Sequence, residues 1–231
     1  MIIVITGTSR GIGLSLVKRY ISKGHVVIGC SRSESEYTNE NYHHFQVDLS
    51  NEDEINKFAH SIKKQFGSLD VLINNAGIAS MNHFMFTPLE TAKKVMTTNF
   101  FAPFAMTRAC VGLLKKSKTP RIINFSTVAV PFNLDGELAY VASKSAVESM
   151  TKILAKELAQ FKITVNAVGP TPVKTFLTAK VPENKINALL DRQAIKRFGE
   201  FEDIGNVIDF YIQPSSEFIT GQIIYLGGVN K

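Results

Sequence analysis

The stretch AYVASKS, residues 139 to 145, places a phenol at Tyr140 and an ammonium at Lys144, four positions apart. On a helix, residues at this spacing share a face, with Cβ atoms about 6 Å apart. An unperturbed tyrosine has a pKa of about 10, and a nearby positive charge lowers it by favouring phenolate. Tyr140 is therefore predicted to donate a proton to a carbonyl oxygen and to accept one in the reverse reaction. The pair alone is weak evidence, because a Tyr-x-x-x-Lys match is expected by chance about 0.5 times in this chain.

A glycine-rich turn supplies a second candidate site. TGTSRGIG, residues 6 to 13, follows the apolar stretch IIVIT and contains Gly7, Gly11 and Gly13. Bare backbone lets a pyrophosphate approach, and the start of the following helix offers free N–H donors. Three glycines can also form a plain turn, but the predicted strand-turn-helix context favours dinucleotide binding.

Composition bounds the class of protein. The 231 residues are 45% hydrophobic and 20% charged, which is typical of a globular chain, and we predict a single domain over residues 1–231. The apolar start MIIVITG has no basic segment before it and is too short for a signal peptide or a membrane span, so a cytoplasmic location is expected. Cys30 and Cys110 are predicted to be buried thiols, and no metal site is expected.

The charge does not indicate nucleic acid. The formal net charge is +6, but the Lys and Arg residues are scattered instead of forming a stripe. Anionic small molecules are the more probable partners on this pattern, and neither nucleic acid nor membrane is expected. His43 and His44 have no carboxylate or Cys nearby in the sequence and are predicted to lie on the surface.

Runs rich in Val and Ile alternate with longer amphipathic segments. The predicted strands are residues 2–6, 25–29, 44–47, 69–74, 121–126, 163–168 and 222–226. Continuous apolar runs are typical of strands covered on both faces, so we predict an α/β fold with a doubly wound parallel sheet. Ser50 is a candidate cap of the helix that ends near Gly67, and Pro103 should disturb a helix that begins near Pro88. The irregular residues 170–200 are predicted to form a substrate lid.

Taken together, these motifs resemble the classical short-chain dehydrogenase/reductase family. The likeness rests on TGTSRGIG, NNAG at 74–77, Asn99, the Tyr140/Lys144 pair and ITGQ at 219–222, which occur in the family's order and spacing. It implies a seven-stranded Rossmann-like fold that binds NAD or NADP, most like the 3-oxoacyl-carrier-protein reductases or the sugar and ketone reductases. It also implies a homodimer or homotetramer paired through the helices around 90–116 and 139–161.

The resemblance assigns four catalytic positions: Tyr140, Lys144, Thr127 and Asn99. Lys144 also holds the nicotinamide ribose, and together with an oxidised nicotinamide it would lower the pKa of Tyr140. Asn99 bends a helix and reaches the lysine through water. Where the family usually carries a serine that bonds the substrate oxygen, this chain has Thr127, with Ser126 beside it. We favour Thr127, because adjacent strand residues point to opposite faces.

NADP is favoured over NAD on charge. Ser31 stands where an NAD enzyme usually offers an acid to the ribose, and Arg32 and Arg10 could meet a 2′-phosphate. The alternative is that both arginines are solvated surface charges. Asp48 matches an adenine-contacting position or caps a helix, and both readings stay open. The predicted cofactor-binding residues are Gly7, Ser9, Arg10, Gly11, Ile12, Gly13, Ser31, Arg32, Asp48, Leu49, Asn75, Ala76, Gly77, Tyr140, Lys144, Pro170, Val173 and Thr175.

The sequence favours an NADPH-dependent oxidoreductase that acts on a small carbonyl or alcohol. Thr171 and Leu226 replace a usual glycine and aspartate, so the alternative is a catalytically impaired NADP-binding sensor. The physiological direction stays open, because the same residues serve oxidation and reduction. A partly hydrophobic pocket is expected from apolar residues that could also be core or interface residues: Ile78, Met81, Phe84, Val130, Phe132 and Leu134.

Overall fold

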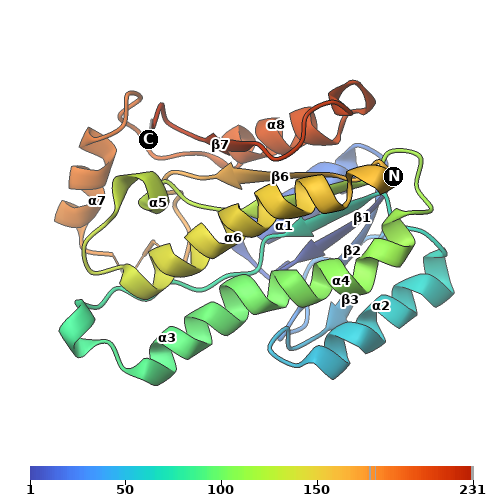
Figure 1. Ribbon diagram of the computed structural model, residues 1–231, viewed down its shortest axis with the longest axis horizontal. Coiled ribbons are helices and arrows are strands. Elements are labelled where there is room, and N and C mark those ends of the chain that lie inside the picture. Colours follow the sequence, from blue (N-terminus) through green and yellow to red (C-terminus); the bar gives the residue numbers. More distant parts are fainter. Residues whose placement is uncertain (177, 180, 230–231) are drawn as a thin grey trace.

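The computed structural model describes residues 1–176, 178–179 and 181–229, and within them seven strands form one parallel sheet (Figure 1). The sheet order is β3-β2-β1-β4-β5-β6-β7, and each neighbouring pair is parallel. The strands are β1 (Ile2–Thr6), β2 (Val26–Ser31), β3 (Tyr42–Gln46), β4 (Val71–Asn74), β5 (Arg121–Phe125), β6 (Thr164–Gly169) and β7 (Ile223–Tyr225). All seven predicted strands and the doubly wound fold are thereby confirmed, with boundaries shifted by a few residues.

Helices cover both faces of the sheet and create two hydrophobic cores. On one face lie α2 (Glu52–Phe66), α4 (Ala102–Leu114) and α6 (Leu138–Glu157), and on the other α1 (Gly11–Ser22) and α8 (Phe201–Ile212) (Figure 1). The inner strands are buried along almost their whole length, as the continuous apolar runs predicted. Cys30 and Cys110 are both buried free thiols in the first core, as expected.

The start of α2 corrects one predicted cap. Asn51, and not Ser50, is the N-cap residue, and its side chain accepts hydrogen bonds from the backbone N–H groups of Asp53 and Glu54. The Ser50 hydroxyl instead donates to Asp48 at 2.7 Å. The two residues are equally good caps by type, so only the backbone path decides between them. Gly67 ends the helix with φ of +76°, as predicted.

The predicted disturbance at Pro103 takes the form of a π-helical turn. The helix α3 (Leu89–Met96) runs into Thr97–Phe101, where the turn widens, and α4 follows. The N–H of Ala102 reaches back five residues to the carbonyl of Thr97. Proline has no N–H to donate to the carbonyl four residues earlier, which is that of Asn99. The wide turn therefore contains Asn99, whose contacts are described below.

The sheet order reverses between β1 and β4, and the chain segments at this carboxyl edge form the site. Ligands of open α/β sheets bind where the order reverses. Short helices surround the edge or connect elements: Phe84–Phe86, α5 (Ala129–Phe132), Ala159–Phe161, α7 (Glu183–Asp191) and Pro214–Ser216. Leu177 and Lys180 of the predicted lid lie outside the described residues. None of the helices in the described part of the chain is long and apolar enough to cross a membrane.

Candidate active site

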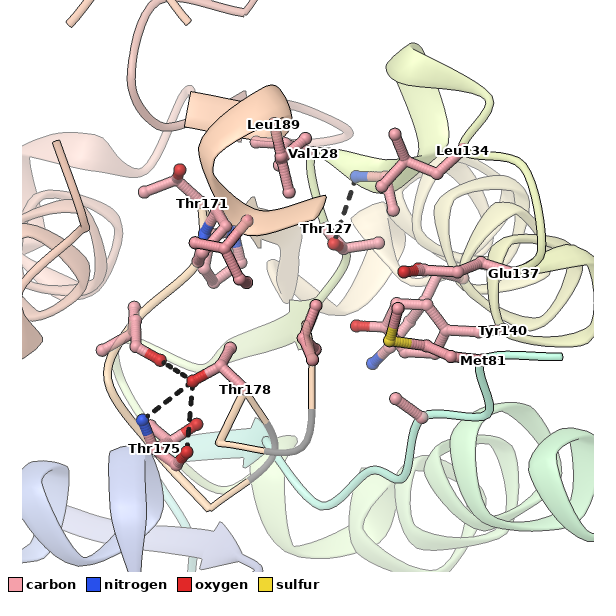
Figure 2. Close-up of a pocket in the computed structure, with 18 of the residues that line it drawn as sticks. Met81, Thr127, Val128, Leu134, Glu137, Tyr140, Thr171, Thr175, Thr178 and Leu189 are labelled. Atoms are coloured by element: carbon pink, nitrogen blue, oxygen red, sulfur yellow. Dashed lines mark hydrogen bonds between the residues drawn. The ribbon is translucent and has the colours of Figure 1, made fainter. Parts of the chain in front are cut away.

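A cavity of about 510 Å³ opens at the carboxyl edge of the sheet (Figure 2). Its walls come from the first glycine turn, the loops after β4 and β5, the start of α6 and the segment 170–192. The sequence-predicted residues that line it are Ile12, Asn75, Gly77, Thr127, Tyr140, Lys144, Pro170, Val173 and Thr175. Residues far apart in the chain are thus brought together at one place, as predicted.

Tyr140 and Thr127 direct their hydroxyl groups into the same part of the cavity (Figure 2). Burial raises the pKa of Tyr140 to about 12, although a hydrogen bond with the Thr127 side chain lowers it, and the charge of Glu137 raises it further. In the protein without cofactor, loss of solvent outweighs the other influences on this pKa. The predicted lowering by Lys144 together with an oxidised nicotinamide stays a prediction. The phenol consequently holds its proton at neutral pH.

Lys144 lies one helical turn beyond Tyr140 and is buried. Its Nζ donates a hydrogen bond to the carbonyl oxygen of Phe125 at 2.8 Å, at the end of β5. Burial lowers the pKa of Lys144 to about 8. A Cβ atom at Gly77 would lie 3.5 Å from this Nζ and 3.3 Å from Asn99 Oδ1, so the missing side chain at Gly77 leaves room for both polar groups.

Asn99 fixes the loop after β4 against α6. Its Oδ1 accepts a hydrogen bond from the N–H of Ile78 at 2.9 Å. Its Nδ2 donates to the carbonyl of Ile78 at 2.9 Å and to Ser143 Oγ at 3.0 Å. Because Ser143 precedes Lys144 directly, Asn99 holds the backbone from which the lysine extends. Asn99 does not line the cavity itself, and its side chain acts here through protein neighbours.

Ser126 and Thr127 divide as the strand alternation predicted. The Thr127 hydroxyl meets Tyr140 and accepts a hydrogen bond from the N–H of Ala129 at 3.2 Å. The Ser126 hydroxyl instead donates to the buried carboxylate of Glu148 at 2.5 Å. Tyr225 also donates to that carboxylate oxygen at 2.5 Å, and any side chain at Gly169 would collide with the Tyr225 ring.

The network of Glu148, Ser126 and Tyr225 was missed from the sequence. A glutamate four residues after Lys144 on an amphipathic helix has the pattern of an exposed residue, and no local signal pairs it with a tyrosine 77 positions later. The network joins α6, the end of β5 and β7 directly behind Thr127. It therefore stabilises the backbone that presents Thr127 and the Phe125 carbonyl.

The glycine turn has the shape that a pyrophosphate requires. Gly7 and Gly11 have φ of +75° and +58°, a region that favours glycine, and a side chain at Gly13 would collide with the carbonyl oxygen of Gly7. Asn75 Nδ2 donates to the carbonyls of Thr6 at 2.8 Å and Gly7 at 3.2 Å, which ties the end of β4 to this turn. No acidic residue occurs in the first turn of α1, so its N-terminus is electrostatically open to an anion.

The residues beyond β2 present cations but no acid at the Ser31 position. Arg32 and Arg10 are exposed, and the Arg10 guanidinium lies 4.2 Å from the centre of the Phe176 ring. The Ser31 hydroxyl donates to the carbonyl of Ser33 at 2.6 Å. Asp48 accepts hydrogen bonds from the N–H and hydroxyl of Ser50, and these bonds hold its pKa below the usual range. Asp48 therefore orders the turn before α2 but does not cap the helix, whose cap is Asn51, and its adenine contact stays a prediction.

His44, predicted to lie on the surface, is partly exposed, and its ring has hydrogen-bond partners. Its ring is partly buried, with Nε2 2.9 Å from the Ser33 carbonyl oxygen and Nδ1 2.9 Å from the hydroxyl of Tyr42. The partners are a backbone carbonyl and a tyrosine, so a search for neighbouring carboxylates or cysteines could not find them. His44 and Tyr42 support the turn at the end of β2.

The two residues that differ from the family pattern, Thr171 and Leu226, both pack within the fold. Thr171 is buried, and its Oγ1 has no hydrogen-bond partner among the described residues, although the residue lines the cavity. Its methyl group packs over Gly199, where a Cβ atom would lie only 2.7 Å away. Leu226 packs against the second hydrophobic core.

The remaining predicted residues lie close to these features. A Cβ atom on Gly7 would come within 2.9 Å of Ala76 Cα, and Thr175 is the nearest side chain to Gly11. Ser9 is a half-buried residue of the glycine turn, and Leu49 packs against the first core.

The predicted apolar pocket is confirmed only in part. Met81 and Leu134 line the cavity, whereas Phe84 is 69% exposed. Ile78, Val130 and Phe132 are not among the described residues that line it. Instead, the Arg192 guanidinium lies 4.2 Å from the centre of the Phe132 ring and donates to the Phe132 carbonyl at 2.9 Å. This contact joins the end of α7 to α5.

Comparison with known proteins places this geometry in a family. The family model of the short chain dehydrogenases matches residues 1–186. A 3-oxoacyl-[acyl-carrier-protein] reductase of Vibrio cholerae is 30% identical over 97% of this chain and 95% of its own length. A 3alpha-hydroxysteroid dehydrogenase of Mediterraneibacter gnavus is 32% identical over 99% of this chain and 96% of its own length.

A solved structure is similar over the same span. The ligand-free aldohexose dehydrogenase of Thermoplasma acidophilum is 27% identical, with a TM-score of 0.90 over 99% of this chain and 93% of that protein. The matches in sequence and structure cover the glycine turn, the sheet and the Tyr140/Lys144 pair together. The chain belongs to the short-chain dehydrogenase/reductase family of oxidoreductases.

Proposed function

We propose that this protein is an NADPH-dependent oxidoreductase that interconverts a carbonyl compound and a secondary alcohol. The observation that carries the proposal is the convergence of the Thr127 and Tyr140 hydroxyls, with Lys144 beside them, in one cavity that also takes in the end of the glycine turn. The named relatives act on an oxoacyl group, a hydroxysteroid and an aldohexose, all of which contain a carbonyl or an alcohol.

The described residues fit a nicotinamide cofactor. The turn formed by Gly7, Gly11 and Gly13 and the N-terminus of α1 would hold the pyrophosphate. Lys144 would hold the nicotinamide ribose, and Thr175 would contact the polar groups of the nicotinamide end. When bound, the cofactor supplies or accepts a hydride.

The protein's own residues bind and protonate the substrate. Thr127 holds the carbonyl oxygen, and Tyr140 donates the proton that this oxygen needs as it becomes an alcohol. Because burial raises the pKa of Tyr140 to about 12, the phenol carries that proton at neutral pH and is ready to act as the acid. The charge of Lys144 stabilises the phenolate that remains.

NADP rather than NAD is proposed on charge. Arg32 and Arg10 are the exposed cations near the end of β2 and in the glycine turn, and Ser31 brings no carboxylate that would repel a 2′-phosphate. A charge-assisted hydrogen bond to phosphate from either guanidinium would favour NADP.

Turnover tests the proposed function directly. The purified protein should oxidise NADPH in the presence of a panel of ketones, with NADH oxidised more slowly at equal concentration. Tight NADPH binding without turnover of any carbonyl in the panel would instead favour the impaired sensor that Thr171 and Leu226 suggest.

We also propose a homo-oligomer paired through helices. Exposed apolar side chains occur on or beside α3, α4 and α6, and these helices lie side by side on one face (Figure 1). They include Leu89, Phe101, Phe104, Leu138 and Ile153. Sedimentation at micromolar concentration should give at least a dimer, and a monomer would contradict this proposal.

A further inference from the structure

Glu137 brings a carboxylate into the cavity beside the proposed acid. It is the N-cap residue of α6, yet its side chain caps no helix N–H. Among the described residues it makes no side-chain hydrogen bond and no ion pair, and it is half-buried in the cavity wall. Figure 2 shows its carboxylate turned toward the same space as the hydroxyls of Tyr140 and Thr127.

The electrostatics support the closeness of Glu137 to the reacting centre. Its charge raises the pKa of Tyr140, so the carboxylate lies within electrostatic reach of the phenol. Burial raises the pKa of Glu137 itself, and the ammonium of Lys185, on α7 across the cavity, opposes this shift. Asp135 and Arg192 also line the cavity. A half-buried carboxylate with no donor costs free energy that a suitable ligand group would recover.

The position of Glu137 limits where such a ligand group can be. Tyr140 is to bond the carbonyl oxygen, and the Glu137 carboxylate is turned toward the space in front of the Tyr140 hydroxyl (Figure 2). A substrate group that meets Glu137 is then one or two bonds from the carbonyl carbon. The cavity wall around this point is apolar and suits a carbon skeleton: Met81, Val128, Leu134 and Leu189.

We propose that Glu137 is a specificity-determining residue that selects carbonyl substrates with a hydrogen-bond donor, a hydroxyl or an ammonium, one or two bonds from the carbonyl. The same carboxylate disfavours substrates that carry an anionic group at that place, because like charges repel in a partly desolvated cavity. This inference rests on the proposed carbonyl reduction. It makes hydroxy ketones, including sugar-like compounds, the favoured class.

Three four-carbon ketones with matched skeletons test the inference. They are 3-hydroxy-2-butanone, 2-butanone and 2-oxobutanoate, which carry a hydroxyl, a hydrogen and a carboxylate next to the carbonyl. The parent protein should reduce the hydroxy ketone with a kcat/KM about tenfold to a hundredfold above that for 2-butanone. In Glu137→Leu this ratio should fall to about one, and 2-oxobutanoate should become a better substrate.

Two further variants separate charge from shape. Glu137→Gln keeps the length and an acceptor oxygen but loses the charge, so it should retain part of the preference for the hydroxy ketone. Glu183→Gln makes the same charge change at an exposed position of α7 outside the cavity lining, and it should behave as the parent. Circular dichroism and NADPH affinity confirm that each variant is folded.

The outcomes distinguish two failures. An unchanged ratio of the two ketones in a folded Glu137→Leu protein would overturn the inference and leave carbonyl reduction standing. A parent protein that reduces an acetoacetyl thioester but prefers 2-butanone to the hydroxy ketone would also overturn it. A parent that reduces no carbonyl at all would overturn the proposed function itself, and the inference with it.

Discussion

Lys144 should make the stability of the protein depend on pH in a direction opposite to that of a lysine paired with a carboxylate. Its pKa is lowered by burial from 10.5 to about 8. Between these values the unfolded chain binds a proton that the folded protein has released, so the free energy of unfolding rises as pH rises. Below about pH 8 both states carry the proton and the full cost of the buried charge is present. The shift of about 2.5 units corresponds to about 3 kcal/mol.

A neutral replacement isolates this contribution. Lys144→Met keeps much of the packing volume and cannot titrate. The free energy of unfolding, measured by urea denaturation with circular dichroism from pH 7 to 10.5, should rise in the parent relative to Lys144→Met by about 3 kcal/mol. Other titrating groups are common to both proteins and cancel in the difference. A difference that stays flat over this pH range would show that Lys144 is not held at a lowered pKa, and the reasoning from its burial would fail.

Three further substitutions probe the cofactor end, the substrate oxygen and the support behind it. Arg32→Ala should lose about 1.5 to 3 kcal/mol of NADPH affinity by removing one charge-assisted phosphate contact, with NADH affinity unchanged; equal losses for both cofactors would contradict the NADP assignment. Thr127→Ala should lower kcat/KM for ketone reduction about tenfold or more, whereas Thr127→Ser should retain most of the parent kcat/KM. An inactive serine variant would show that the hydroxyl group alone does not account for the role of Thr127. Glu148→Leu leaves the hydroxyls of Ser126 and Tyr225 without their acceptor and should destabilise the fold by about 2 to 4 kcal/mol. The control Glu157→Leu, on the exposed end of α6, should change stability by less than about 0.5 kcal/mol. Equal effects of the two substitutions in thermal melts would refute the buried role of Glu148.

The sheet was predictable because its strands are covered on both faces. Such strands must be apolar along their length, and this leaves a pattern that local reading detects. The choice of Thr127 over Ser126 was also predictable, because it follows from the alternation of side chains at the end of β5. Features that depend on neighbouring residues in the sequence could therefore be predicted from it.

Features that depend on partners far away in the sequence could not be predicted from it. The pairing of Glu148 with Tyr225 and the contacts of His44 arise only when strands and helices meet in space. The burial that raises the pKa of Tyr140 in the protein without cofactor was also hidden, because the spacing to Lys144 shows the cation but not the loss of solvent around the phenol. The cap of α2 was assigned to Ser50 instead of Asn51 because both residue types can cap a helix and only the backbone path decides between them.

The kinetics of Tyr140→Phe test the central claim most directly. Phenylalanine keeps the ring and removes the proton that Tyr140 is proposed to donate. With a ketone that the parent reduces, turnover should fall by about 10² to 10⁴, while the affinity for NADPH stays nearly unchanged. A folded Tyr140→Phe protein that binds NADPH and reduces the same ketone at the parent rate would show that Tyr140 is structural and that the proposed proton transfer is wrong.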